Sequence, residues 1–367
     1  MNQKIKIIDS IRDVPVDAYN RVIEQYIDAI SSNPHVLAVY QLGTVRNPGI
    51  SDLDLIVVVD DVIDPMRLNG LRARNEALDG YTKYIFVHDV LVYNRTAFLE
   101  LHYHLFADDL KLLFGRPLKI AMPPPEEKII LGLQILFDYT AGKLSQFKRL
   151  LAGSKLDSRG ILLRVGSLKH SANLLKAIGI QDDSLDKFVT TVLEARCEPC
   201  RLSVDQIANI FMKSFFQFTR VANLASEHFE RKHLGYYSMV DNSVRFRLNT
   251  NQAMVFTDCT NLTERQAYQL PLVYYPTAAF FHVLSSMGDK SFLSMRAGQH
   301  LSHRGDEIFE INETYRSVRH RRLQSLSDHF AFLHHNRLGF SVAGNPGFVF
   351  SCHGIPLPPC LAKSAIE

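Results

Sequence analysis

Residues 36–61 read VLAVYQLGTVRNPGISDLDLIVVVDD, and this stretch decides how the N-terminal third of the chain folds. An apolar run leads into Gly43-Thr44, a short polar loop follows, and Asp52 and Asp54 alternate with leucines before a second apolar run. The pattern predicts a strand, a turn and a second strand. Side chains two residues apart in a strand project from one face, about 6.5 to 7 Å apart. We therefore expect the two carboxylates to converge on one site, with Leu53 and Leu55 facing the other way.

Two carboxylates on a rigid strand edge suit a divalent metal. Magnesium prefers hard oxygen ligands, and a two-metal site has its ions about 3.5 to 4 Å apart, which one bridging carboxylate can span. Gly43 has no Cβ and lets backbone N–H groups approach a ligand, while the Thr44 hydroxyl adds a donor for a phosphate oxygen. The alternative is a hairpin with two aspartates that face only solvent.

Leu42-Gly43-Thr44, a loop and then Ser51-Asp52-Leu53-Asp54-Leu55 resemble the signature of the DNA polymerase beta type nucleotidyltransferase superfamily. Thr44 stands where that signature most often has serine. The resemblance covers about the first third of the chain. It implies that Asp52 and Asp54 hold Mg²⁺ or Mn²⁺, and that Gly43, Thr44 and Ser51 bind a nucleoside triphosphate.

The same resemblance implies a third carboxylate on a strand that follows the aspartate pair. Residues 81–93 are rich in Tyr, Ile, Phe and Val and predict a strand, interrupted by His88-Asp89. Asp89 is the best match to the third catalytic and metal-binding position, since a buried carboxylate needs a partner or a metal. Alternatively, Asp89 lies at an edge and makes an ordinary hydrogen bond.

The implied reaction is transfer of a nucleoside monophosphate from the triphosphate to an acceptor hydroxyl, with release of pyrophosphate. The acceptor stays open between a small hydroxyl compound, a nucleotide, a protein side chain and an RNA end. A second hypothesis is a catalytically inactive nucleotide-binding regulator or scaffold with the same fold.

Composition narrows the class of protein. The 367 residues, 46% hydrophobic and 22% charged, predict a globular chain of two or three domains. A net charge of +3 is modest and counts against a long nucleic acid as partner. Five cysteines, an odd number, argue against a disulfide framework and favour the cytoplasm. The uncharged stretch 266–288 contains Pro271 and Pro276, which favours a buried segment over a membrane span.

Periodicity and punctuation predict an α+β chain in three parts. The first, 1–122, is a nucleotidyltransferase domain with a mixed sheet; the second, 123–234, is helical; the third, 235–367, is a mixed α/β region. Pro123-Pro124-Pro125 marks the first boundary. The sequence predicts helices over residues 16–31, 65–78, 95–113, 126–151, 158–177, 184–195, 204–231, 275–287 and 310–336, and a hairpin around residues 249–252.

Three groups of residues leave alternatives open. One polar set, either a solvated face or the lining of a cleft opposite the metal site, comprises Asp138, Lys143, Lys148, Arg149, Arg164 and Lys169. A basic cluster, either an exposed helix side or a grip for a phosphate-bearing acceptor, comprises Arg316, Arg319, His320, Arg321 and Arg322. Cys197 and Cys200 have zinc-like or redox-like spacing without a second pair nearby.

Overall fold

The computed structural model describes residues 6–62, 71, 81–105, 109–152, 155–232, 235–236, 243–247, 253–257, 273–275, 310–311 and 313–335. Helices and small sheets occur together, which confirms the predicted α+β class. The predicted helices over residues 65–78 and 275–287 lie largely outside the described residues, as does most of the uncharged stretch 266–288. Among the helices that are described, none has the length and apolar character needed to cross a membrane.

The N-terminal unit is a four-stranded mixed sheet in the order β4-β3-β2-β5. Its strands are β2 (Val36–Leu42), β3 (Asp54–Val59), β4 (Leu91–Asn94) and β5 (Leu110–Gly115). Strand β2 pairs antiparallel with β3 and β5, and β3 pairs parallel with β4. The predicted strand, turn and strand of residues 36–61 are therefore confirmed.

Alternation along β3 gives the sheet two different faces. Leu55, Val57 and Val59 pack with residues of α1 (Val16–Ser31) in one buried cluster. Ile56 and Val58 pack on the opposite face, against α3 (Arg95–Leu99) and α4 (Leu101–His104). Because side chains alternate with a period of two, Asp54 belongs to the face of Ile56 and Val58. Leu53, buried with Leu55, faces away from it as predicted.

Two predictions in this unit are wrong. Residues 81–93 do not form one strand: Thr82–Ile85 is a short helix, α2, and the strand β4 begins only at Leu91. Residues 95–113 do not form one helix, because residues 110–115 pair with β2 as strand β5. Gly115 ends this strand at φ 85°, and a Cβ there would lie 2.1 Å from the Leu37 carbonyl oxygen. Pairing with the edge of β2 overrides the local helical periodicity.

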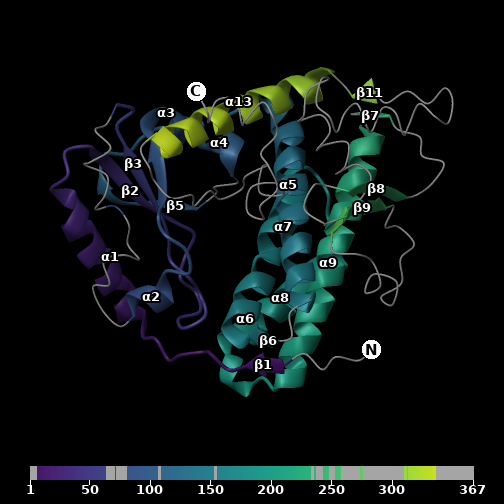
Figure 1. The fold of residues 1–367 in the computed structure, drawn as a ribbon, viewed down its shortest axis with the longest axis horizontal. Helices are drawn as coiled ribbons and strands as arrows, with labels where there is room; N and C mark the ends of the chain where they lie inside the picture. Colours follow the sequence, from purple (N-terminus) through teal and green to yellow (C-terminus); the bar gives the residue numbers. More distant parts are fainter. Residues whose placement is uncertain are drawn as a thin grey trace.

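The second unit consists of long helices beside the sheet (Figure 1). They are α5 (Pro125–Ala152), α6 (Ser158–Gly166), α7 (Leu168–Ala177), α8 (Asp183–Cys197) and α9 (Val204–Arg231), with the 3-10 helix η2 (Pro199–Arg201) between the last two. Their apolar stripes form one large core. The helix predicted over residues 158–177 is divided in two at Ser167, and the others agree closely with prediction. Residues 116–124, which lead into α5, contain no helix or strand.

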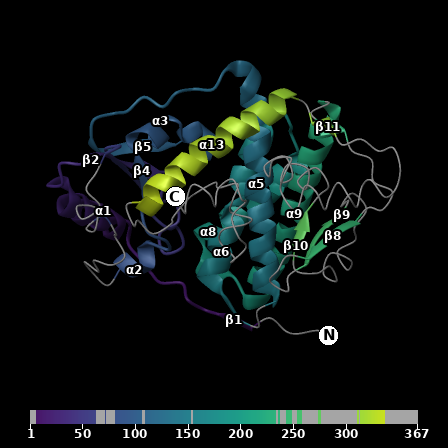
Figure 2. The same cartoon turned by 45° about the horizontal axis from the view of Figure 1, so that its top comes forward.

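Two segments tie the units together. Strand β1 (Lys6–Ile8), at the N-terminal end, pairs in parallel with β6 (Lys155–Asp157) of the helical unit. Helix α13 (Glu313–His335) runs across both units in Figures 1 and 2, and it packs against α3, α4, β4 and α5. Its Tyr315 and Val318 belong to the helical core, and its Leu333 belongs to the α1 side of the sheet.

The described remainder of the C-terminal part consists of short strands. Strands β8 (Ser243–Arg247) and β9 (Ala253–Thr257) pair antiparallel, which confirms the predicted hairpin. Strand β10 (Val273–Tyr275) pairs in parallel with β9. Strands β7 (Gly235–Tyr236) and β11 (Glu310–Ile311) form a separate pair just before α13.

The basic cluster on α13 is partly inside the protein, so the prediction of an exposed helix side is wrong for two of its members. Arg319 and Arg322 are 2% and 0% exposed, and both donate to Oδ2 of the buried Asp138 on α5, from 2.9 and 2.5 Å. Arg321, closer to the surface, pairs with Glu127. His320 is exposed. Asp138 thereby leaves the set of residues available to a cleft, because it fastens α13 to α5.

Candidate metal centre

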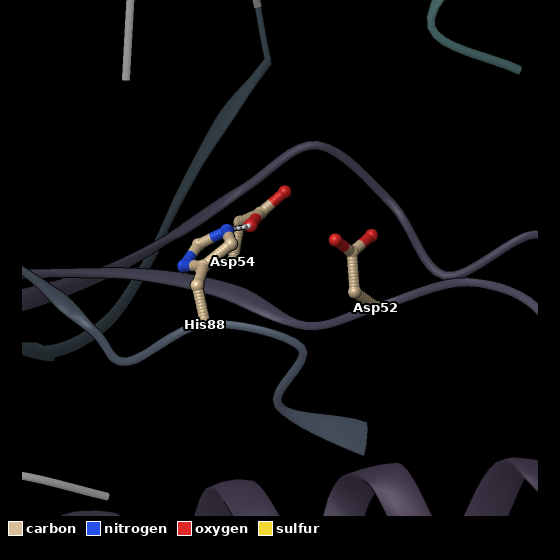
Figure 3. Close-up of side chains that lie close together, drawn as sticks. All are labelled: Asp52, Asp54 and His88. Carbon is tan, nitrogen blue, oxygen red and sulfur yellow. Dashed lines mark ion pairs between the residues drawn. The ribbon is translucent and has the colours of Figure 1, made fainter. Parts of the chain in front are cut away.

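Asp52, Asp54 and His88 lie together at the edge of the N-terminal sheet. Each offers one ligand atom, and these atoms all lie within 4.8 Å of one another. Asp54 is the first residue of β3, and Asp52 lies two residues before it, on the same side of the chain (Figure 3). The predicted convergence of the two carboxylates is therefore present. All three side chains are partly buried.

His88 lies beside the two aspartates, where the sequence predicted a third carboxylate. Its Nε2 lies 2.6 Å from Oδ1 of Asp54, and its Nδ1 lies 2.7 Å from the backbone carbonyl oxygen of Asp89. The ring reaches the aspartates from the loop between α2 and β4, which runs beside β3. The sequence prediction placed Asp89 in the third position, whereas the residue that contacts Asp54 here is its neighbour His88.

The side chain of Asp89 makes a local hydrogen bond. Its Oδ1 accepts a hydrogen bond from the N–H of Val90 at 3.0 Å, and its carboxylate is not part of the three-residue cluster. Strand β4, which pairs in parallel with β3, begins only at Leu91, so Asp89 lies in the loop that leads into this strand. Residues 86–90 are outside any strand, and the alternation that predicted the direction of Asp89 does not apply there.

The loop before Asp52 is held by an extensive set of hydrogen bonds. The Tyr19 hydroxyl donates to the Ser51 carbonyl at 2.7 Å and accepts from the Gly49 N–H at 3.1 Å. The Tyr84 hydroxyl donates to the Gly49 carbonyl at 2.5 Å. Arg159 of α6 donates to the Ser51 carbonyl at 3.4 Å, with its guanidinium carbon 3.8 Å from the centre of the Tyr84 ring. These contacts fix the position of Asp52 before any ligand is bound.

The three residues assigned to the nucleotide have distinct positions. Gly43 has φ 74°, which favours glycine, and its N–H donates to the Asp109 carbonyl at 2.8 Å. Thr44 is exposed, and its Oγ1 accepts from Nε of Arg46 at 3.2 Å. Ser51 is buried, and its Oγ accepts from the Asn47 N–H at 3.2 Å. Of the three, only Thr44 presents an exposed hydroxyl, while Ser51 serves the loop itself.

Cations of the helical unit lie within electrostatic reach of Asp52. Lys143 of α5, Lys169 of α7 and Arg196 of α8 each interact electrostatically with it. None of the three forms an ion pair with any carboxylate in the described part of the chain. Lys143 and Lys169 belong to the polar set that the sequence left open between a solvated face and the lining of a cleft. Arg159 and Arg196 were not found from the sequence. The side chains of Lys148 and Arg149 lie outside the described residues.

The charges in this region alter proton affinities. Burial, together with the neighbouring Asp54 carboxylate, raises the pKa of Asp52 to about 6. Burial alone would lower the pKa of His88, but its hydrogen bond to Asp54 raises that pKa to about 9. Burial and the charge of Arg164 lower the pKa of Lys143 to about 8. Asp52 and His88 therefore hold their protons more strongly than usual, and Lys143 holds its proton less strongly.

Cys197 and Cys200 are free, exposed thiols. Cys197, the last residue of α8, accepts a hydrogen bond from Nδ2 of Asn47 at 3.3 Å. Within the described residues, neither cysteine belongs to a group that could hold a metal. The Asn47 contact nevertheless connects the end of α8 to the loop that precedes Asp52.

Comparison of the chain with protein-family models, with curated proteins and with solved structures finds no match.

Proposed function

We propose that the chain is a metal-dependent nucleotidyltransferase. It transfers a nucleoside monophosphate from a nucleoside triphosphate to an acceptor hydroxyl: the acceptor oxygen bonds to the α phosphorus, the bond from that phosphorus to the bridging oxygen breaks, and pyrophosphate leaves. The acceptor hydroxyl gives its proton to a water molecule in this step. The proposal rests on the resemblance of residues 42–55 to the superfamily signature and on the arrangement of charges around Asp52.

The main support for this proposal is the presence of both anionic ligands and cations in one region of the protein. The cluster of potential metal ligands Asp52, Asp54 and His88 lies within electrostatic reach of cations that have no described carboxylate partner. These cations are Lys143, Lys169 and Arg196. A metal–triphosphate complex has both requirements, because its metal ions need anionic ligands and its phosphate oxygens need cationic donors. Divalent metal, when bound, would neutralise charge on the phosphates and on the leaving group.

The protein's own part is to position and to neutralise charge. Asp52 and Asp54 hold the metal, and Lys143 and Lys169 bind phosphate oxygens. The exposed Thr44 hydroxyl and Arg46 lie at the start of the loop that follows β2. Phosphoryl transfer needs little covalent help, so a rigid loop and fixed charges are a sufficient contribution.

A second candidate is a nucleotide-binding regulator without turnover. The observation in its favour is that the third position of the cluster holds His88, while the Asp89 carboxylate accepts from its neighbour's N–H. A site with two acids would still bind a metal–triphosphate complex but would have less negative charge to orient the acceptor.

The deciding experiment supplies the purified protein with each of the four labelled nucleoside triphosphates and Mg²⁺ or Mn²⁺. We expect pyrophosphate and a labelled product, both lost in Asp52→Asn and Asp54→Asn variants that bind no metal and remain folded by circular dichroism. Nucleotide binding without pyrophosphate would favour the regulator, and absence of both binding and turnover would overturn both candidates.

The cations provide a second test. Lys169→Ala should weaken triphosphate binding by about ten- to a hundredfold, because a charge-assisted hydrogen bond contributes roughly 1.5 to 3 kcal/mol. The matched control is Lys176→Ala on the same helix, whose lysine is 46% exposed and pairs with Asp186. Equal effects of the two changes on the dissociation constant would show that Lys169 does not contact the phosphates.

A further inference from the structure

We propose that His88 is a direct metal ligand through Nε2, and that it makes the centre selective for a first-row transition metal ion such as Mn²⁺ over Mg²⁺. This inference rests on the proposed function only in using the same metal centre; metal binding can be measured without nucleotide or turnover.

The orientation of the ring identifies the ligand atom. Nδ1 lies 2.7 Å from the Asp89 carbonyl oxygen, which can only accept a hydrogen bond, so Nδ1 must carry the hydrogen. In the neutral ring, the lone pair is then on Nε2, which points at Asp54 Oδ1 from 2.6 Å (Figure 3). Two acceptor atoms so close together require a cation between or beside them. A proton can serve, and so can a metal ion.

The hydrogen bond to Asp89 has the form of support that metal-bound histidines use. A ligating imidazole almost always donates its second N–H to a carboxylate, a carbonyl or water, which fixes its tautomer and its direction. Here the supporting carbonyl belongs to Asp89, and the Asp89 carboxylate in turn accepts from the Val90 N–H at 3.0 Å. Asp89 is thereby given a positioning role instead of the ligand role that the sequence suggested.

The donor set determines which ion is preferred. Magnesium is held by oxygen ligands and seldom by imidazole, whereas the later first-row ions accept nitrogen readily and manganese, although hard, accepts it more readily than magnesium does. Replacing a third carboxylate by an imidazole also removes one negative charge, which weakens the binding of a hard ion more than that of a softer one. Two carboxylates and one imidazole therefore favour a transition metal ion.

The test measures Mn²⁺ and Mg²⁺ affinity by calorimetry and records the pulsed electron paramagnetic resonance spectrum of bound Mn²⁺, all without nucleotide. We expect ¹⁴N coupling in the unaltered protein and its loss in His88→Asp. The same substitution, which restores a third carboxylate, should lower the ratio of Mn²⁺ to Mg²⁺ affinity by about tenfold or more. His35→Gln is the matched control, since His35 lies 3.4 Å from Asp60 in another histidine–aspartate pair and should leave both readouts unchanged.

The outcomes separate this inference from the proposed function. Bound Mn²⁺ without ¹⁴N coupling, or an affinity ratio that His88→Asp leaves unchanged, would overturn the inference even if nucleotidyl transfer is observed. Coupling that depends on His88 in a protein that transfers no nucleotide would uphold the inference and count against the proposed function. If His88→Asp does not fold, the presence or absence of ¹⁴N coupling in the unaltered protein, with His88→Gln as the second variant, still decides.

Discussion

At the scale of single residues, the centre combines charges that repel one another when no metal is bound. Asp52 has a pKa raised to about 6 by burial and by Asp54, so its ionised form costs folding free energy at neutral pH. The sign follows from proton uptake: between the ordinary pKa near 4 and about 6 the folded protein binds more protons than the unfolded chain. This contribution therefore destabilises above pH 6 and disappears as the pH falls toward 4.

Asp52→Asn should accordingly stabilise the metal-free protein while it abolishes metal binding. At pH 7.5 in a chelator we expect the free energy of unfolding to rise by on the order of 1 kcal/mol, with the gain reduced by solvent screening and absent near pH 4. Urea unfolding at the two pH values measures it. Asp60→Asn, a change in the more exposed aspartate that pairs with His35, should bring no such gain. A variant less stable than the unaltered protein at pH 7.5 would show that Asp52 has a supporting contact.

The residues of the centre were predictable to different degrees. Alternation predicted that Asp52 and Asp54 face one way, because Leu53 and Leu55 are apolar and face the core. The two aspartates do converge, although β3 begins only at Asp54. His88 could not be chosen over Asp89 in this way, since the loop at residues 86–90 has no fixed period. The cations Lys143, Lys169 and Arg196 come from three different helices, and their meeting at Asp52 depends on tertiary packing alone.

At the scale of elements, the long helices were predicted well and the short segments near the sheet were not. Helix α9 begins and ends where its apolar stripe does, because 28 residues of consistent period leave little choice. Strand β5 is only six residues long, and its apolar residues fit either a helix face or a strand. The free edge of β2 decides between them, and that edge is defined by residues some 70 positions earlier.

Helix α13 is docked through a buried histidine pair that should make docking sensitive to acid. His329 stacks on Tyr93 of β4, with ring centres 4.3 Å apart, and lies 5.3 Å from His104 of α4. His104 bonds to Ser325 at 2.9 Å, and Ser325 donates to Glu100. Burial lowers the pKa of His329 to about 3, and burial with the charge of His329 lowers the pKa of His104 well below its usual value.

The free energy of unfolding should therefore fall as the pH drops below about 6.5. In this range the two histidines bind protons in the unfolded chain, whereas in the folded protein the buried rings stay neutral. Each ring contributes a slope of up to about 1.4 kcal/mol per pH unit, which for His329 continues toward pH 3. His329→Phe keeps the stack on Tyr93 and should flatten the slope by one proton in urea titrations between pH 4 and 6.5. His320→Gln, at an exposed position of the same helix, should leave it unchanged. Equal slopes in all three proteins would refute the assignment.

At the scale of the whole molecule, Asp138 is the point where helix α13 is fastened to the helical unit. Its Oδ2 accepts from both Arg319 and Arg322, and all three side chains are almost fully buried. Removing the shared carboxylate should cost about 3 to 5 kcal/mol, because two buried guanidinium groups lose it together. Arg319→Ala should cost less than Asp138→Ala, since Arg322 still pairs with the carboxylate. Thermal or urea unfolding compares the two variants, and the control is Asp186→Ala, in the exposed ion pair with Lys176.

An Asp138→Ala variant as stable as that control would show that Asp138 does not fasten α13.

The segment that links the two units has no regular secondary structure, but many contacts between residues distant in the sequence hold the units together. Residues 116–124, which contain the predicted boundary at Pro123, form no helix or strand. Most apolar residues on either side belong to different clusters, but Ile50 of the N-terminal part is buried in the core of the helical unit. However, β1 pairs with β6 across that boundary, Arg159 lies on Tyr84, and α13 contributes apolar residues to a core on each side. These contacts join segments that are distant in the sequence, so the local run of prolines could not predict them.

Cutting the connection should therefore leave the molecule assembled. A protease site inserted after Met122, which is 73% exposed, should be cleaved in the native protein, and the two pieces should elute together in gel filtration. They should separate in urea, and in native buffer they should separate more readily when Asp138→Ala loosens α13. Transfer activity, if the proposed function holds, should survive the cut, because Asp52 and the cations of the helical unit stay in place. A folded N-terminal piece that elutes alone in native buffer would show that the contacts through β1, Arg159 and α13 are too weak to hold the two units together.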